Sequence, residues 1–140
     1  MKLFGRKEGQ RTEQLLYKRD KRELSRLLSE MGETTEDALR QAIRSLLDRD
    51  SDRARQVIDG DDRVDDQEVG IEQECLRSIG MRQPVRDDLR FVFSVLKIIT
   101  DLERMGDQAV NIAKTSIELN RQPLFKPLED TPKMAEQAIT

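Results

Sequence analysis

The segment from Val85 to Ile117 constrains the fold most, because its apolar residues recur at alternating steps of four and three positions. This spacing places them along one face of a long amphipathic helix, which we expect over about residues 84–120. Every position of this seam is apolar or small except Glu103. A buried, unpaired carboxylate is costly, so we expect Glu103 to be neutralised, ion-paired or bound to a metal.

Two further helices are predicted from the same kind of spacing, over residues 12–47 and 52–79. Asp50 or Ser51 can cap the second of these helices, and Gly80 is a typical residue to end it. Short connections between long helices imply antiparallel neighbours, and no strand-like alternation is visible. The sequence therefore predicts an all-α fold, an antiparallel up-down three-helix bundle.

The two ends of the chain are expected to lie outside this bundle, which spans residues 12–120. Residues 1–11 are expected to form an N-terminal tail. Residues 121–140 hold three of the four prolines, which indicates an extended linker followed by the start of a further, short C-terminal helix. A helix of that length is marginal alone, so we expect either that the chain is cut short or that this end docks on a partner.

Composition narrows the class of protein. Charged residues make up 38% of the chain and the net charge is −3, with no basic stripe visible, so nucleic-acid binding is not expected. A single cysteine, Cys75, excludes an internal disulfide and is typical of a reducing compartment. No apolar run approaches the length of a membrane span, and Met1 is not followed by a signal peptide. We therefore expect a cytoplasmic protein whose contact with membranes, if any, is peripheral and made through partners.

Acidic residues gather where the second and third helices are expected to face each other. If the chain folds back at about Arg82, Asp61 lies 21 residues before the turn and Glu103 lies 21 residues after it. The two carboxylates should then face each other at one level, with Asp65 and Asp107 one turn away on the same faces. Like charges at this density need a cation or shared protons.

The predicted metal ligands are Glu103, Asp107, Asp61 and Asp65. The chain has no histidine, so such a site would be oxygen-only and would suit iron, Mg²⁺, Mn²⁺ or Ca²⁺. The alternative is that basic side chains pair these acids on a solvated face, and the available ones are Arg63, Arg90, Lys97 and Arg104. Glu68 and Glu72 are expected to be solvated, because no matching acid is expected opposite them.

Several motifs together resemble the PhoU family, the regulators of bacterial phosphate uptake. They are Gly60-Asp-Asp-Arg-Val-Asp65, Arg82-Gln-Pro, Asp88-Leu-Arg, Leu102-Glu-Arg-Met-Gly-Asp107 and Asn111-Ile-Ala. The resemblance covers about residues 17–113 and implies two tandem three-helix bundles, each able to hold a multinuclear metal cluster. This chain carries one such bundle, so we expect a single-repeat or truncated member that forms a homodimer.

The resemblance implies a non-enzymatic negative regulator of phosphate-starvation signalling. Its expected role is that of an adaptor between a phosphate ABC transporter and a sensor histidine kinase. Two other classes stay open. A helical scaffold without ligand would tolerate alanine at Glu103 and Asp107. A carboxylate-bridged metalloenzyme on a helical bundle is disfavoured, since the usual di-iron design needs histidines that this chain lacks.

Overall fold

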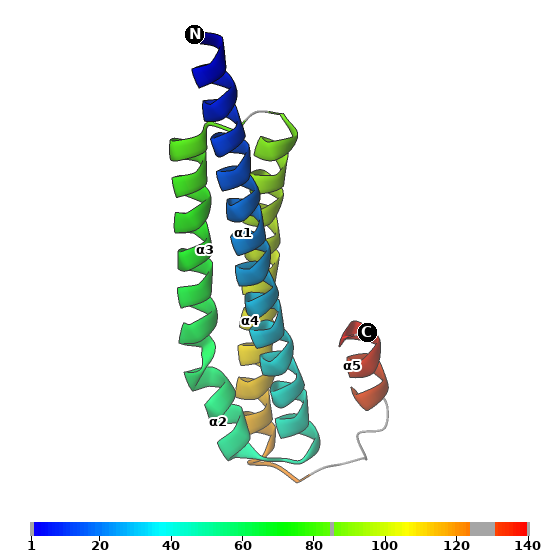
Figure 1. The fold of residues 1–140 in the computed structure, drawn as a ribbon. Helices are drawn as coiled ribbons and strands as arrows, with labels where there is room; N and C mark the ends of the chain where they lie inside the picture. Colours follow the sequence, from blue (N-terminus) through cyan, green and yellow to red (C-terminus); the bar gives the residue numbers. More distant parts are fainter. Residues whose placement is uncertain (1, 85, 124–130, 140) are drawn as a thin grey trace.

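The computed structural model describes residues 2–84, 86–123 and 131–139, and only the backbone of residues 2–16. Within these residues no strand occurs, and three antiparallel rods lie side by side (Figure 1). The first rod is α1, the second is α2 followed by α3, and the third is α4. The prediction of an all-α, up-down three-helix bundle with a short C-terminal helix is confirmed. The helices are α1 (Lys2–Leu47), α2 (Ser51–Asp59), α3 (Asp61–Arg82), α4 (Asp87–Leu119) and α5 (Thr131–Ile139).

The first helix begins earlier than predicted. It starts at Lys2 rather than near Thr12, so residues 2–11 extend α1 and do not form a separate tail. Lysine, arginine, glutamate and glutamine in this segment have high helix propensity, although they form no apolar stripe. The helix also passes through Gly32 without interruption. As a result, the N-terminal turns of α1 project beyond the end of the bundle (Figure 1).

The second predicted helix is divided at Gly60. This residue ends α2 and precedes α3, and a Cβ atom built on it would lie 3.2 Å from the backbone oxygen of Gln56. Asp50 caps α2 by accepting a hydrogen bond from the backbone amide of Arg53 at 3.1 Å, as one of the two predicted caps. α3 continues past Gly80 to Arg82. A junction at Gly60 thus lets the lower part of the rod change direction toward α4.

The core has two sections with different side-chain sizes. The upper section, between α1, α3 and α4, is filled by large residues that include Met31, Ile71 and Ile99. The lower section, around α2, is dominated by alanines such as Ala42, Ala54, Ala109 and Ala113. Because small side chains allow helix backbones to approach closely, α2 fits between α1 and α4 at this end.

Polar contacts fix both ends of the bundle. At one end Arg49 donates to the backbone oxygens of Asn120 at 3.3 Å and of Leu119 and Gln122, which satisfies carbonyls at the C-terminal end of α4. At the other end the hydroxyl of Tyr17 donates to the backbone oxygen of Asp88 at 3.0 Å. These contacts join α1 to α4 and so set the height at which all side chains of the two rods meet.

Two predicted features lie wholly or partly outside the described residues. Val85, the first residue of the predicted seam, is one of them, and residues 124–130 of the proline-rich linker are the other. Beyond the linker, α5 contacts α1. None of the described helices has a stretch that is both long and apolar enough to cross a membrane.

Candidate metal centre

One flank of α3 carries a row of carboxylates that faces α4. Asp61, Asp65, Glu68 and Glu72 follow one another at helical spacing, so their side chains leave the helix on the same side. The opposite flank of the interface is formed by α4, where Glu103 and Asp107 are four residues apart. Because Val64 and Ile71 of α3 are buried against the core, this acidic row lies at the edge of the packed interface rather than inside it.

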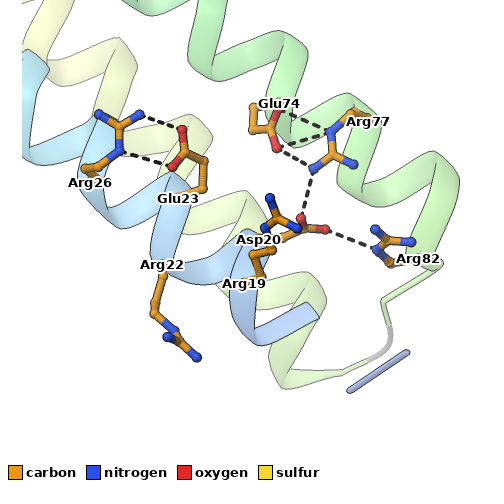
Figure 2. Close-up of a pocket in the computed structure, with 8 residues that line it drawn as sticks. All are labelled: Arg19, Asp20, Arg22, Glu23, Arg26, Glu74, Arg77 and Arg82. Atoms are coloured by element: carbon orange, nitrogen blue, oxygen red, sulfur yellow. Dashed lines mark hydrogen bonds and ion pairs between the residues drawn. The ribbon is translucent and has the colours of Figure 1, made fainter. Parts of the chain in front are cut away.

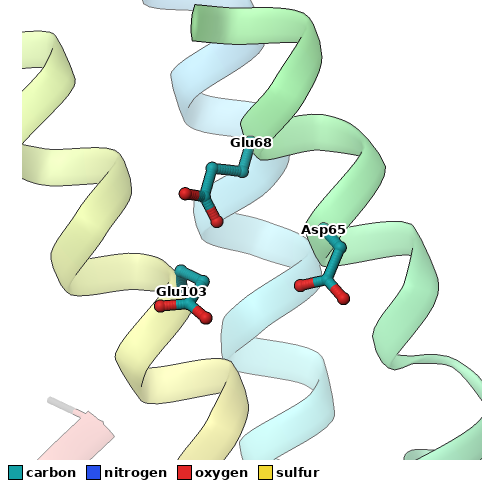
Figure 3. Close-up of side chains that lie close together, drawn as sticks. All are labelled: Asp65, Glu68 and Glu103. Atoms are coloured by element: carbon teal, nitrogen blue, oxygen red, sulfur yellow. The ribbon is translucent and has the colours of Figure 1, made fainter.

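Three of these carboxylates converge. Asp65, Glu68 and Glu103 each offer one oxygen atom, and the three atoms lie within 4.8 Å of one another. Figure 3 shows Asp65 and Glu68 extending from α3 toward Glu103 on the neighbouring helix. Glu68 and Glu103 are half-buried and Asp65 is exposed. The cluster is therefore open to solvent on one side and closed by the two helices on the other.

The other two predicted ligands lie one turn away along the same strip. An oxygen of Asp61 lies 3.5 Å from the position that a Cβ atom would take on Gly106. Val64 lies closer still, with a methyl group 3.3 Å from that position. Asp107 follows Gly106 on α4 and contributes repulsion to Asp61. Gly106 thus allows α3 and α4 to approach closely where the acids meet.

Within the described part of the chain, no basic side chain forms an ion pair with the cluster. Among the described residues, none of the acids at positions 61, 65, 68, 103 and 107 forms an ion pair within 4.0 Å. Lys114 offsets part of the repulsion at Asp61. The alternative in which basic residues pair these acids is therefore not realised. The basic residues expected to pair with the acids in that alternative were Arg63, Arg90, Lys97 and Arg104.

Burial and neighbouring carboxylates raise the pKa values of Glu103, Glu68 and Asp61. Desolvation raises the pKa of Glu103 first, and the hydrogen bond and charge of Asp107 add to it, followed by Glu68 and Asp65. Desolvation likewise raises the pKa of Glu68, with Glu72 the next cause. At Asp61 the pKa is raised by desolvation and then by the charges of Asp65 and Asp107. Such mutual repulsion is relieved by a proton or by a cation.

The structure corrects the predicted register by one helical turn. Glu103 faces Asp65 and Glu68, whereas Asp61 lies against Gly106. Residues that face each other across a turn lie equally far from its centre. These facing pairs therefore place the centre of the turn near residue 84, two residues beyond Arg82. The non-helical connection between Arg82 and Asp87 causes the shift, because moving the centre of the turn by one residue moves the opposing position by two.

Two further expectations about single residues need revision. Glu103 is not in the core: the buried residues of α4 include Val95, Ile99 and Ala109 but not Glu103, which lies at the edge of the interface. Glu68 was expected to be solvated, with no acid opposite it, and this is wrong since it joins Glu103. Had the turn been predicted at residue 84 instead of Arg82, Glu68 would have been expected within one helical turn of Glu103. Cys75 is buried, as expected of a small core residue, and burial raises the pKa of its thiol to about 11.

Comparison with known proteins places this bundle in a family. Residues 28–116 match the family model described as the PhoU domain. The chain is 41% identical over 106 residues to the phosphate-specific transport system accessory protein PhoU homolog of Aquifex aeolicus, covering 76% of this chain and 48% of that protein. It is 43% identical over 102 residues to the protein named phosphate-specific transport system accessory protein PhoU of Escherichia coli K12, covering 71% and 42%.

A solved structure shows the same fold. The crystal structure of PhoU from Pseudomonas aeruginosa matches with a TM-score of 0.83 and 31% sequence identity, over 88% of this chain and 59% of that chain. The chain spans about half the length of the first two relatives described above. The matched family model covers most of the bundle, including both helices that carry the carboxylates. This chain belongs to the PhoU family.

Proposed function

We propose that the protein is a non-enzymatic regulator of phosphate uptake that represses phosphate-starvation signalling. The observation that carries this proposal is the PhoU-domain match over residues 28–116. It is supported by relatives of about 40% identity whose names describe accessory proteins of the phosphate-specific transport system. The protein would act in the cytoplasm as an adaptor between a phosphate ABC transporter and a sensor histidine kinase.

The regulatory role can be tested in a bacterium that lacks its own PhoU protein and carries a phosphate-starvation reporter. Expression of this chain should lower reporter activity in phosphate-rich medium and leave it high in phosphate-poor medium. A variant with Glu68→Gln and Glu103→Gln should repress less at equal protein level. Reporter activity that is the same with and without the chain, at confirmed expression, would contradict the proposal.

A bound cation is the second part of the proposal, and the donor set fits one. Asp65, Glu68 and Glu103 would hold it, and Asp61 and Asp107 would extend the site to further ions. The three oxygens lie within 4.8 Å of one another, so small side-chain movements would bring all of them onto one ion. An all-carboxylate donor set suits Ca²⁺, Mg²⁺, Mn²⁺ or iron, and Ca²⁺ accepts the longest ligand distances, about 2.3–2.6 Å. The ion would supply positive charge that offsets the repulsion between α3 and α4.

We further propose that two copies of the chain associate through α4. Ile98, Met105, Ile112 and Leu119 recur every seven residues, the spacing of a helix-pairing seam. Three of them are well exposed, with 42% for Ile98, 41% for Met105 and 45% for Leu119. A second copy packed on this stripe would cover it, much as a second bundle would.

Sedimentation at tens of micromolar protein, with metal present, tests the association. The chain should sediment as a dimer, and Met105→Glu should convert it to a monomer because a charge would enter the seam. Val69→Glu is the matched control, since Val69 is 50% exposed on α3 and lies outside the seam. A wild-type monomer under these conditions would rule out the homodimer.

A further inference from the structure

A groove rich in arginine lies on the other flank of α3, between this helix and α1. Its volume is about 890 Å³, and every described residue that lines it is charged. The groove opens beside the end of α3 that leads to α4 (Figure 2). It is separate from the carboxylate strip, which faces α4. The lining residues are Arg19, Asp20, Arg22, Glu23, Arg26, Glu74, Arg77 and Arg82.

The floor of the groove is a network of ion pairs around a buried acid. Asp20 is only 5% exposed and accepts from Arg77 at 2.9 Å and from Arg82 at 3.2 Å. Arg77 is also paired with Glu74. Figure 2 shows the two arginines of α3 reaching Asp20 from different positions along that helix. The acid therefore holds two guanidinium groups at the surface of the groove in fixed positions.

Two arginines of the groove form no ion pair with a described acid. Arg26 pairs with Glu23 and Glu30, at 2.6 Å in each case. Arg19 and Arg22 form no ion pair within 4.0 Å with any described residue. The described lining has five arginines and three acids, and Glu30 outside the lining offsets a fourth arginine charge, so one positive charge remains in surplus on a chain whose net charge is −3. A local surplus of this sign on an acidic protein attracts small anions.

The chemistry of the lining selects among anions. Guanidinium groups match phosphate oxygens with paired N–H donors, and the positive surplus favours an anion over a neutral ligand. The terminal nitrogens of Arg82 are not engaged with Asp20, which accepts from Nε. Among the described residues of the lining, none is an aromatic residue on which a nucleobase could stack. We infer that this groove binds phosphate groups through Arg19, Arg22 and Arg82, as free orthophosphate or as a short polyphosphate chain.

Titration calorimetry on the full chain tests the inference, with EDTA present to keep metal from binding the anion at the carboxylate strip. Orthophosphate and tripolyphosphate are titrated separately, and ATP supplies a triphosphate with a nucleoside attached. Saturable binding of orthophosphate or tripolyphosphate supports the inference. The compound that binds more tightly shows whether the groove prefers free orthophosphate or a polyphosphate chain. ATP should bind no more tightly than tripolyphosphate. A tenfold preference for ATP would contradict a site without nucleobase recognition.

Charge-matched variants decide whether the groove is the site. Arg19→Gln with Arg22→Gln should weaken binding about tenfold or more, because both unpaired charges are lost. Arg44→Gln with Arg90→Gln removes two exposed arginines elsewhere and should change affinity less than about twofold. Equal losses in both variants, or no saturable binding of either phosphate compound up to about 10 mM, would overturn the inference.

A gain-of-binding variant gives an independent check. Asp20→Asn removes the acid that occupies Arg77 and Arg82 while keeping its shape, so phosphate should bind several-fold more tightly. Equal or weaker binding, in a variant whose circular dichroism is unchanged, would place the anion elsewhere. All of these measurements use the purified chain without partners. Their outcome is therefore distinguishable from failure of the regulatory role, which is measured in cells.

Discussion

Replacing Glu103 by glutamine should stabilise the metal-free protein. The mutation removes one negative charge from the interface between α3 and α4 and keeps a half-buried side chain in place. Glutamine keeps the size and helix propensity of glutamate. It removes repulsion from Asp65 and Glu68, whose oxygens lie within 4.8 Å of an oxygen of Glu103. No basic partner is lost, because Glu103 forms no ion pair with a described residue.

The expected gain follows from Coulomb's law. Two unit charges at 4.8 Å in water repel by about 0.9 kcal/mol, so the two pairs contribute about 1.7 kcal/mol at very low ionic strength. Screening at about 0.15 M salt, with a Debye length of about 8 Å, reduces this to about 1 kcal/mol. At about 1 M salt the Debye length is about 3 Å, and about 0.3 kcal/mol remains. The gain should therefore fall steadily as salt is added.

Urea unfolding followed by circular dichroism at pH 7 in EDTA measures this gain, and the melting temperature should rise by about 3 °C at 0.15 M salt. The matched control is Glu33→Gln, an exposed glutamate of α1 for which no ion pair occurs among the described residues, and it should change stability little. Addition of Ca²⁺ or Mg²⁺ should reverse the order by stabilising the wild type more than the variant. A loss of stability in EDTA would refute the account of mutual repulsion.

Three other perturbations have defined outcomes. Since burial and neighbouring acids raise the pKa values of Glu68 and Glu103, the folded state holds protons that the unfolded chain releases. The protonated Glu68 and Glu103 contribute fully to folding stability below pH 4.5, the ordinary pKa of glutamate. This contribution is lost as the pH rises through their raised pKa values in the folded state. Unfolding of the metal-free chain across this window, compared with the double glutamine variant, should reveal that slope, and identical slopes would contradict it. Ile99→Ala should cost about 2–5 kcal/mol in urea unfolding, as Ile99 is 1% exposed in the upper core, and a cost below about 1 kcal/mol would not fit that position. Gly106→Leu should destabilise the fold by about 2 kcal/mol or more, because even a Cβ atom there lies 3.3 Å from Val64, and an unchanged melting temperature would disprove that close approach.

The helices could be predicted because their apolar spacing is long and regular. The three rods, the cap at Asp50 and the antiparallel order all follow from that spacing and from short connections. The division at Gly60 could not be predicted in the same way, since Gly32 and Gly80 lie inside continuous helices of the same protein. In the structure a Cβ atom on Gly60 would lie 3.2 Å from the backbone oxygen of Gln56, whereas one on Gly32 or Gly80 would meet nothing within 4 Å, and apolar spacing does not reveal this difference.

The candidate site was predicted in kind but not in register. Acids on both helices indicated that α3 and α4 would share a carboxylate cluster, yet the opposing levels depended on where the chain reverses. A two-residue difference in that point replaced Asp61 by Asp65 and Glu68 opposite Glu103. The arginine groove was beyond sequence reasoning altogether. Its charges are interspersed along α1 and α3, and only the pairing of these helices gathers them.

Metal content measured on protein purified without chelator tests the central claim most directly. The wild type should carry about one metal ion or more per chain, held by Asp65, Glu68 and Glu103. A variant with glutamine at both glutamates and asparagine at Asp65 should carry almost none, while the Arg19→Gln, Arg22→Gln variant should retain the wild-type amount. Equal metal content in the wild type and the carboxylate variant would contradict the assignment of a cation to this strip.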